Sequence, residues 1–203
     1  MADAFYFYKS FIKESVRHLF FMEKKNGNWT INETKKIFEN DFFKVYEDDV
    51  IKPEGEPGKF ATVHLVPGAC VLAIDDEDFV YLTEQFRYVV GRNSIEVVAG
   101  SIEDETPLEA AKRELKEEVG ATAEEMTEIG VVQLDTSMIK NEVSFFVARK
   151  LSFDKPDRDE TEEMKTVKIK FREAVEKVLT GEIDHALSRA LILQAWAQSG
   201  NKL

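Results

Sequence analysis

Residues 100–121 read GSIEDETPLEAAKRELKEEVGA, and this stretch decides the fold because it carries the signals of one well-defined helix. Thr106 is a favoured N-cap residue, and Pro107 suits the first helical position. Glu109 stands three residues after Thr106, which completes a capping box. Gly120 stands where a helix would end in a left-handed C-cap. The stretch therefore predicts a helix that begins at Pro107 and ends before Gly120.

The polar side of this helix carries carboxylates at close spacing. Glu114 and Glu118 are four residues apart, so they share a face beside the apolar stripe. Glu117 lies one turn after Arg113. Such a like-charged pair costs about 0.2–0.5 kcal/mol on an isolated helix. A hard cation such as Mg²⁺ would reverse that cost, whereas the alternative is a solvated face held by ion pairs. The stripe itself consists of Leu108, Ala111, Leu115 and Val119.

The charged positions of the stretch resemble the Nudix box, whose pattern is G-x5-E-x7-R-E-U-x-E-E-x-G-U, with U an aliphatic residue. Every fixed position from Glu105 to Ala121 is met. One departure precedes them, because Gly100 stands five residues before Glu105 and the pattern has six. The resemblance implies an α/β fold of Nudix type, an α/β/α sandwich with a mixed sheet. It also favours the metal-binding interpretation over the solvated face.

Composition limits the function classes open to the chain. The 203 residues carry a formal net charge of −12, which argues against a general nucleic-acid or anionic-membrane surface. Cys70 is the only cysteine, so we expect a buried thiol and neither a disulfide framework nor a cysteine cluster. No apolar run is long enough for a transmembrane helix, and no signal peptide is recognisable. These features predict a cytoplasmic protein.

The pattern divides the chain into three segments. Residues 1–28 form an amphipathic extension, residues 29–66 a small antiparallel β subdomain and residues 67–203 the catalytic domain. In the extension, aromatic and aliphatic residues recur at helical spacing. Three interpretations of it remain open: a helix that packs on its own domain or on a second subunit, an interfacial membrane anchor, or an extension before a true start at Met22.

The rest of the chain alternates between strand and helix patterns. We expect two helices near the C-terminus, at residues 171–179 and 183–197. The strands are expected at residues 29–31, 34–38, 42–51, 59–66, 69–74, 79–87, 94–99, 129–132, 144–148 and 167–171. Mixed strands around one long central helix, with helices at the end, also favour an α/β/α sandwich.

Residues outside the box resemble the ADP-ribose pyrophosphatase and nucleoside diphosphate sugar hydrolase branch of the Nudix family. The matching segments are Glu84-Gln85-Phe86-Arg87 and Ile95-Glu96-Val97-Val98-Ala99-Gly100. The resemblance assigns Arg87 to a substrate phosphate and places Glu96 in the site. Glu142 matches a further acidic substrate-side position. Residues 136–139, TSMI, depart from the Ser-Pro-Gly that the branch often has.

The resemblance also implies a metal site and a mechanism. Mg²⁺, with Mn²⁺ as a possible substitute, would bind Glu114, Glu117, Glu118 and the carbonyl oxygen of Ala99. Arg113 would hold the carboxylates, Glu105 would orient Arg113 or the loop, and Gly100 and Gly120 would have structural roles. The general base would come from the acidic loop at residues 154–163, DKPDRDETEE. Its candidates are Glu160, Glu162 and Glu163, of which we favour the last two.

The resulting hypothesis is Mg²⁺-dependent hydrolysis of the pyrophosphate bond of nucleoside diphosphate sugars. ADP-ribose is the first candidate substrate, giving AMP and ribose 5-phosphate, and GDP-mannose or another sugar nucleotide is the next. An alternative from another class is a Nudix-fold protein that binds a nucleotide without hydrolysing it. Hydrolysis of RNA 5′ ends is disfavoured by the net charge. The branch usually dimerises through its N-terminal strands, so we expect a homodimer.

Overall fold

The computed structural model describes residues 24–154 and 164–200. The chain divides into two compact units, with the boundary between His64 and Leu65. Most of the predicted N-terminal extension and the candidate bases Glu160, Glu162 and Glu163 lie outside the described residues. No helix in the two described ranges is long and apolar enough to cross a membrane.

The first unit is a small sheet whose strands follow one another in the order β1-β2-β3-β4. Its β1–β2 and β2–β3 pairs are antiparallel. The two strands expected at residues 29–31 and 34–38 are one strand, because a register shift between Ile31 and Glu33 interrupts the pattern without ending the pairing. The strands are β1 (Lys24–Asn26), β2 (Trp29–Glu39), β3 (Phe43–Ile51) and β4 (Pro57–Leu65).

The second unit is built on a mixed sheet in the order β12-β6-β5-β11-β9, with β7 paired to β6 and β8 paired to β5. The β5–β11 pair is parallel, while β5–β6, β6–β7, β5–β8, β6–β12 and β9–β11 are antiparallel. Its strands are β5 (Gly68–Ile74), β6 (Phe79–Arg87), β7 (Arg92–Glu96), β8 (Val98–Ser101), β9 (Ala121–Gln133), β11 (Glu142–Phe153) and β12 (Met164–Lys170). The two-residue strand β10 (Ile139–Lys140) is not part of this sheet.

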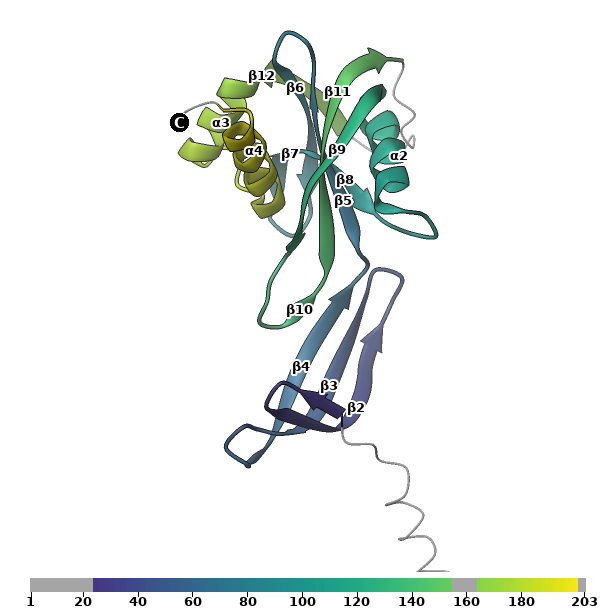
Figure 1. The fold of residues 1–203 in the computed structure, drawn as a ribbon, viewed down its shortest axis with the longest axis vertical. Coiled ribbons are helices and arrows are strands. Elements are labelled where there is room, and N and C mark those ends of the chain that lie inside the picture. Colours follow the sequence, from purple (N-terminus) through teal and green to yellow (C-terminus); the bar gives the residue numbers. More distant parts are fainter. Residues whose placement is uncertain (1–23, 155–163, 201–203) are drawn as a thin grey trace, which may run out of the picture. The chain divides into compact units, whose positions relative to one another are not determined.

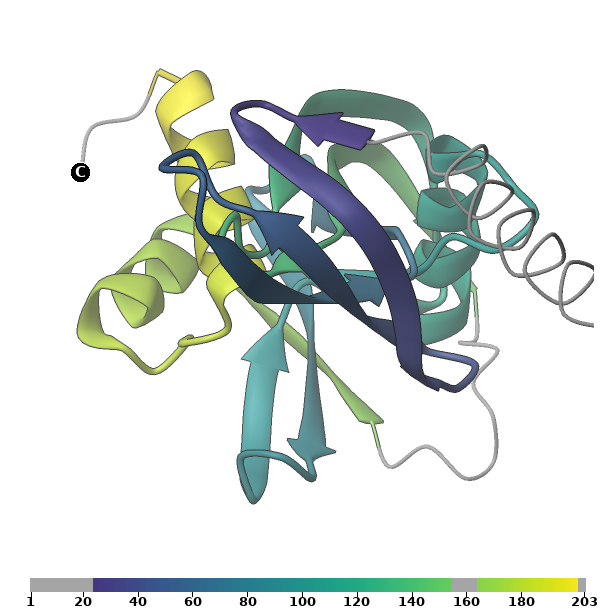
Figure 2. The ribbon, with the colours of Figure 1, turned by 90° about the horizontal axis from the view of Figure 1, so that it is seen from below.

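Helices cover both faces of this sheet, with α2 (Pro107–Val119) on one side and α3 (Phe171–Thr180) and α4 (Ala186–Gln198) on the other (Figures 1 and 2). The central strand β5 is buried on both faces, so it is apolar throughout. Its residues Cys70, Leu72 and Ile74 pack with α3 and α4, while Ala69, Val71 and Ala73 pack with α2. This arrangement confirms the predicted α/β/α sandwich preceded by an antiparallel β subdomain.

The strand expected at residues 94–99 is divided in the structure, and the division matters for the site. β7 ends at Glu96 and β8 begins at Val98, and the two pair with different neighbours. Between them, the backbone N–H of Val97 donates to Ser188 Oγ at 3.0 Å and not to a neighbouring strand. The chain therefore changes partner at Val97. Figure 2 shows the β6–β7 hairpin extending away from the helices.

The helix predicted from the opening stretch is confirmed, with a correction to its apolar stripe. Thr106 accepts from the backbone N–H of Glu109, the Glu109 carboxylate accepts from the backbone N–H of Thr106, and Gly120 has a left-handed φ of 68°. Leu108 is exposed, because the start of the helix packs on the sheet through Ala110 and Ala111 and not through Leu108. The buried residues are Ala110, Ala111, Leu115, Glu118 and Val119.

The capping box yields a stability prediction. Thr106→Ala removes the side-chain oxygen that accepts the Glu109 N–H, so we expect a loss of about 1 kcal/mol in the free energy of unfolding. Thr136→Ala, at an exposed position outside helices and strands, is the control. Urea titration followed by circular dichroism measures both. An equal effect of the two substitutions would show that the box contributes nothing.

Candidate functional site

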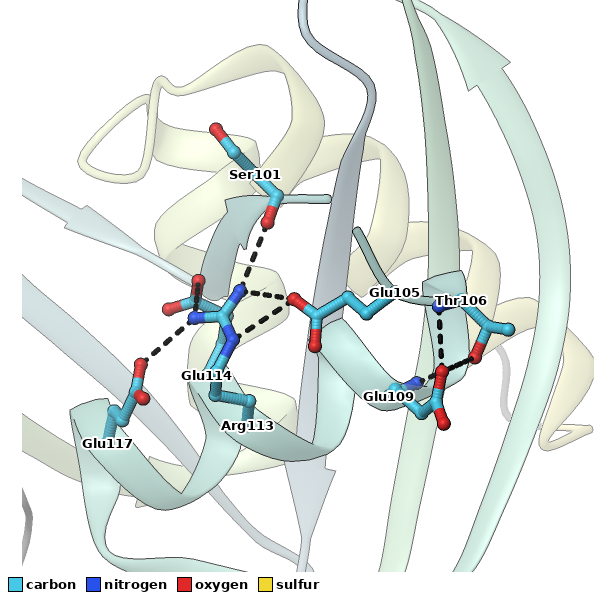
Figure 3. Close-up of polar contacts among 7 residues, drawn as sticks. All are labelled: Ser101, Glu105, Thr106, Glu109, Arg113, Glu114 and Glu117. Atoms are coloured by element: carbon cyan, nitrogen blue, oxygen red, sulfur yellow. Dashed lines mark hydrogen bonds and ion pairs between the residues drawn. The ribbon is translucent and has the colours of Figure 1, made fainter. Parts of the chain in front are cut away.

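Arg113 is the centre of the cluster of charges on α2 (Figure 3). Its Nε and Nη2 donate to Glu105 Oε1 at 3.1 and 2.7 Å. Its Nη1 donates to Glu114 Oε1 at 2.6 Å and to Glu117 Oε2 at 3.0 Å. Nη2 also donates to the carbonyl oxygen of Ser101 at 3.1 Å. One guanidinium therefore holds three carboxylates and the end of β8, and the bond to Glu105 is the main cause that raises the pKa of Arg113.

Glu114 lies in a space that only a glycine leaves open. Its side chain is 13% exposed, and this burial raises the pKa of its carboxyl although Arg113 opposes the shift. A Cβ atom on Gly100 would stand 1.7 Å from Glu114 Oε1. The Gly100 φ angle is not positive, so space and not backbone conformation requires glycine here.

Glu118 and Glu117 differ in burial although they are neighbours in sequence. Glu118 is buried, and its Oε2 accepts a hydrogen bond from the backbone N–H of Ala99 at 3.3 Å. The Glu117 side chain is 40% exposed. The helix therefore presents carboxylates of three different exposures beside Ala99 and Gly100 of β8.

These residues fit a hard divalent cation by the chemistry of their donors. In residues 24–154 and 164–200, no three carboxylate, imidazole or thiol groups converge closely enough to hold a metal ion, and Arg113 separates Glu114 from Glu117. All the available donors are nevertheless oxygens, the ligands that Mg²⁺ and Mn²⁺ prefer. The raised pKa of Glu114 marks a carboxylate that a cation would stabilise.

A second pair of charges stands on the hairpin of β6 and β7. Arg87 Nε and Nη2 donate to Glu96 Oε1 and Oε2 at 2.9 and 2.6 Å, a bidentate pair. The Glu96 side chain is 5% exposed and the Arg87 side chain 42%. Burial alone would raise the pKa of Glu96, but the hydrogen bonds from Arg87 and the other neighbours leave it lowered. The carboxylate therefore stays charged and keeps the guanidinium oriented.

A pocket of about 580 Å³ is lined by the Arg87–Glu96 pair and reaches β8, although none of the α2 carboxylates lines it. Arg87 and Glu96 line it, and so do Ala99 and Gly100 beside the carboxylates of α2. Its remaining polar lining is Ser94, Ser101, Asn141, Asp184 and His185, and its apolar lining includes Leu65, Val90, Leu134, Val143 and Leu187. A ligand in this pocket would contact the predicted phosphate-binding arginine and lie beside the predicted metal ligands.

Sequence reasoning missed several of these polar residues. Ser94 stands two residues before Glu96 in the same strand. Because alternate residues of a strand point to the same face, the sequence could have predicted that Ser94 and Glu96 lie side by side. Asn141 is buried and donates to the carbonyl oxygen of Val66 at 2.7 Å. Glu142, the predicted residue next to it, is exposed and does not line the pocket. His185 precedes α4, far along the chain, and no local pattern distinguishes it.

A family model for the NUDIX domain matches residues 64–189, well over half of the chain. The chain belongs to the Nudix family. This Nudix protein is 31% identical over 152 residues to "ADP-ribose pyrophosphatase" of Bacillus subtilis (strain 168), an alignment that covers 73% of this chain and 82% of the relative. It is also 31% identical over 120 residues to "Methanol dehydrogenase activator" of Bacillus methanolicus, covering 59% and 65% of the two chains.

The Nudix fold is also found in the comparison with solved structures. A structure described as "Crystal structure of ADP compounds hydrolase" matches with a TM-score of 0.75 at 20% identity, covering 89% of this chain and all of that one. At that identity the match shows the fold alone. It agrees with the mixed sheet and flanking helices described above.

The close approach of Gly100 to Glu114 yields a metal-binding prediction. Gly100→Ala would displace the Glu114 carboxylate, so we expect the affinity for Mn²⁺ to fall about 10- to 100-fold with little change in melting temperature. Electron paramagnetic resonance titration measures free Mn²⁺. Gly58→Ala is the control, because its Cβ would meet only the flexible end of Lys52. Unchanged Mn²⁺ affinity in Gly100→Ala would remove Glu114 from the metal site.

Proposed function

We propose that this Nudix hydrolase cleaves the pyrophosphate bond of nucleoside diphosphate sugars, with ADP-ribose as the first substrate and AMP and ribose 5-phosphate as products. The observation that carries the proposal is the pocket lined both by the Arg87–Glu96 pair and by Ala99 and Gly100 of β8. The name of the Bacillus subtilis relative supports the choice of ADP-ribose.

We assign Mg²⁺, with Mn²⁺ as a substitute, to Glu114, Glu117, Glu118 and the carbonyl oxygen of Ala99. When bound, the metal neutralises phosphate charge and lowers the pKa of a bound water. Arg113 sets the positions of the Glu114 and Glu117 carboxylates through its hydrogen bonds. Glu105, in the loop before the helix, in turn orients Arg113, and the left-handed Gly120 ends the helix that carries Arg113, Glu114, Glu117 and Glu118.

The substrate side of the proposal rests on Arg87, whose planar fork suits a diphosphate. Water attacks one phosphorus, the bond from that phosphorus to the bridging oxygen breaks, and the departing phosphate keeps the electron pair. The proton of the water passes to a general base, for which we retain Glu162 or Glu163 from outside the described residues. Glu142 remains a proposed substrate-side residue, although it is exposed at the start of β11.

The test is a substrate panel read by product identity. With Mg²⁺ we expect release of AMP from ADP-ribose to exceed nucleoside monophosphate release from GDP-mannose, UDP-glucose and dinucleoside polyphosphates. Fastest turnover of GDP-mannose would change the substrate and keep the reaction. Binding of these ligands without any product would instead support the non-hydrolytic alternative.

Glu117 tests the metal site within this reaction. Glu117→Gln keeps the size of the side chain and removes its charge, so we expect turnover to fall about 100-fold or more with an unchanged melting temperature. Glu124→Gln, on an exposed part of β9, is the matched control. Wild-type turnover in Glu117→Gln would count against the assigned ligands.

We also propose a cytoplasmic homodimer. The lone, buried Cys70 suits a reducing compartment, and burial raises its pKa to about 12, so the thiol stays unreactive. In the first unit, Ile37, Phe38, Phe42 and Phe60 are exposed, which is typical of a surface that another subunit covers.

The dimer proposal predicts a mass of two chains in sedimentation equilibrium. The double substitution Phe38→Ser and Phe42→Ser removes apolar surface that the dimer would bury. We therefore expect a weaker dimer, with a higher dissociation constant than that of the wild type. Leu179→Ser, at an exposed position on α3, is the control. A wild-type mass equal to one chain would remove the dimer.

A further inference from the structure

His185 stands at the N-cap of α4 and lines the pocket that the proposed function uses. Its Nδ1 lies 2.8 Å from Ser188 Oγ and 3.5 Å from Glu96 Oε2. Its side chain is 29% exposed. Nδ1 contacts the buried hydroxyl of Ser188, so Nε2 is the ring nitrogen left to contact a ligand in the pocket.

Ser188 determines which ring nitrogen of His185 carries the proton. Its side chain is fully buried, and its Oγ already accepts the backbone N–H of Val97 at 3.0 Å. The hydroxyl hydrogen therefore needs an acceptor, and among the described residues His185 Nδ1 is the one within hydrogen-bond distance. An accepting Nδ1 carries no proton in the neutral ring, so Nε2 carries it and is a donor.

Burial keeps the His185 ring neutral near pH 7, although its charged neighbours act in both directions. Burial lowers its pKa first of all, and Arg87 on β6 acts in the same direction. Glu96 on β7 and Asp184 in the preceding loop oppose the shift without cancelling it. Cys70 on β5 lines the same pocket as a neutral thiol, since burial raises its pKa to about 12. The working form is therefore a neutral imidazole.

A neutral N–H donor next to a buried carboxylate suits one kind of ligand group. A phosphate oxygen beside Glu96 would be repelled, and the phosphates already have Arg87 as a partner. A sugar hydroxyl can accept from the imidazole and donate to the carboxylate at the same time. Both side chains line the pocket, and the ring lies beside the carboxylate, with Nδ1 3.5 Å from Glu96 Oε2, so one hydroxyl of a ligand could contact both residues.

We propose that His185 is a substrate-binding residue whose Nε2–H donates to a hydroxyl on the sugar of the substrate, while Glu96 accepts from the same hydroxyl. Ser188 is the positioning residue that holds His185 in the required tautomer. The proposal rests on the proposed function and deepens it, because it makes the second sugar, and not only the diphosphate, a recognised part of the substrate.

The tautomer is tested by long-range ¹H–¹⁵N correlation spectra of protein labelled with ¹⁵N-histidine at pH 7. The chain has three histidines, so the spectrum of His185→Gln identifies the signals of His185. We expect the Nε2–H tautomer in the wild type and a mixture of tautomers in Ser188→Ala. An Nδ1–H tautomer or an imidazolium in the wild type would overturn the inference, whatever the enzyme hydrolyses.

Substrate recognition is tested by calorimetry without metal, with ADP-ribose and with ADP, which lacks the second sugar. His185→Ala should weaken ADP-ribose binding about 10-fold and leave ADP binding unchanged. His185→Gln should recover most of the loss, because its amide nitrogen stands near the position of Nε2. Equal losses for both ligands, or no loss for either, would overturn the role of His185.

The outcomes separate this inference from the proposed function. If the wild type prefers another nucleoside diphosphate sugar, the same comparison applies to that ligand and its sugar-free diphosphate. A wild type that hydrolyses its substrate and tolerates His185→Ala refutes the inference alone. A wild type that binds no nucleoside diphosphate sugar refutes the proposed function and the inference with it.

Discussion

The structure of the site depends on the hydrogen bonds of Arg113. A single guanidinium binds carboxylates from two positions of its own helix and one from the preceding loop, and it also binds the end of β8. Without that charge, Glu114 would be a buried carboxylate facing two others, and burial already raises its pKa. Lysine cannot replace this interaction, because its ammonium lacks the fork that reaches four acceptors in fixed directions. Arg113 thus brings the carboxylates together before any cation binds. A bound cation would neutralise the negative charge that Arg113 leaves uncompensated.

The change of partner at Val97 links the proposed metal ligands to the proposed substrate-binding residues. β7 pairs with β6 and so carries Glu96 beside Arg87, while β8 pairs with β5 and carries Ala99 and Gly100 to α2. Val97 belongs to neither ladder, so the chain leaves the β6 pairing after Glu96 and joins the β5 pairing at Val98. The freed Val97 N–H is satisfied by Ser188 on α4, which in turn contacts His185. One backbone irregularity therefore brings residues of four elements into a single pocket.

The sequence predicts those site residues that lie close together along the chain, and it misses those that only the fold brings together. The helix, its caps and the spacing of Glu114, Glu117 and Glu118 follow from residues within one turn of each other, and they were predictable. Glu96 and Arg87 needed the resemblance to a family, since their pairing joins two strands. His185 and Asn141 come from other elements and reach the pocket only through the sheet order and the start of α4. The division of residues 94–99 was also missed, because an apolar run does not show where the hydrogen-bonding partner changes.

The shortened loop before Glu105 shows why a departure from a motif has to be judged by contacts. The loop is one residue shorter than the Nudix pattern, yet Glu105 Oε1 receives two hydrogen bonds from Arg113. The backbone N–H of Ile102 donates to the carbonyl oxygen of Pro67 at 2.8 Å, which fixes the start of the loop on the sheet. With the loop anchored there and the helix capped at Thr106, the remaining residues need only span the gap between two fixed ends. The hydrogen bonds between Arg113 and Glu105 are therefore present in this chain although the loop is shorter. The missing residue alters the course of the backbone between Gly100 and Glu105 and leaves this contact intact.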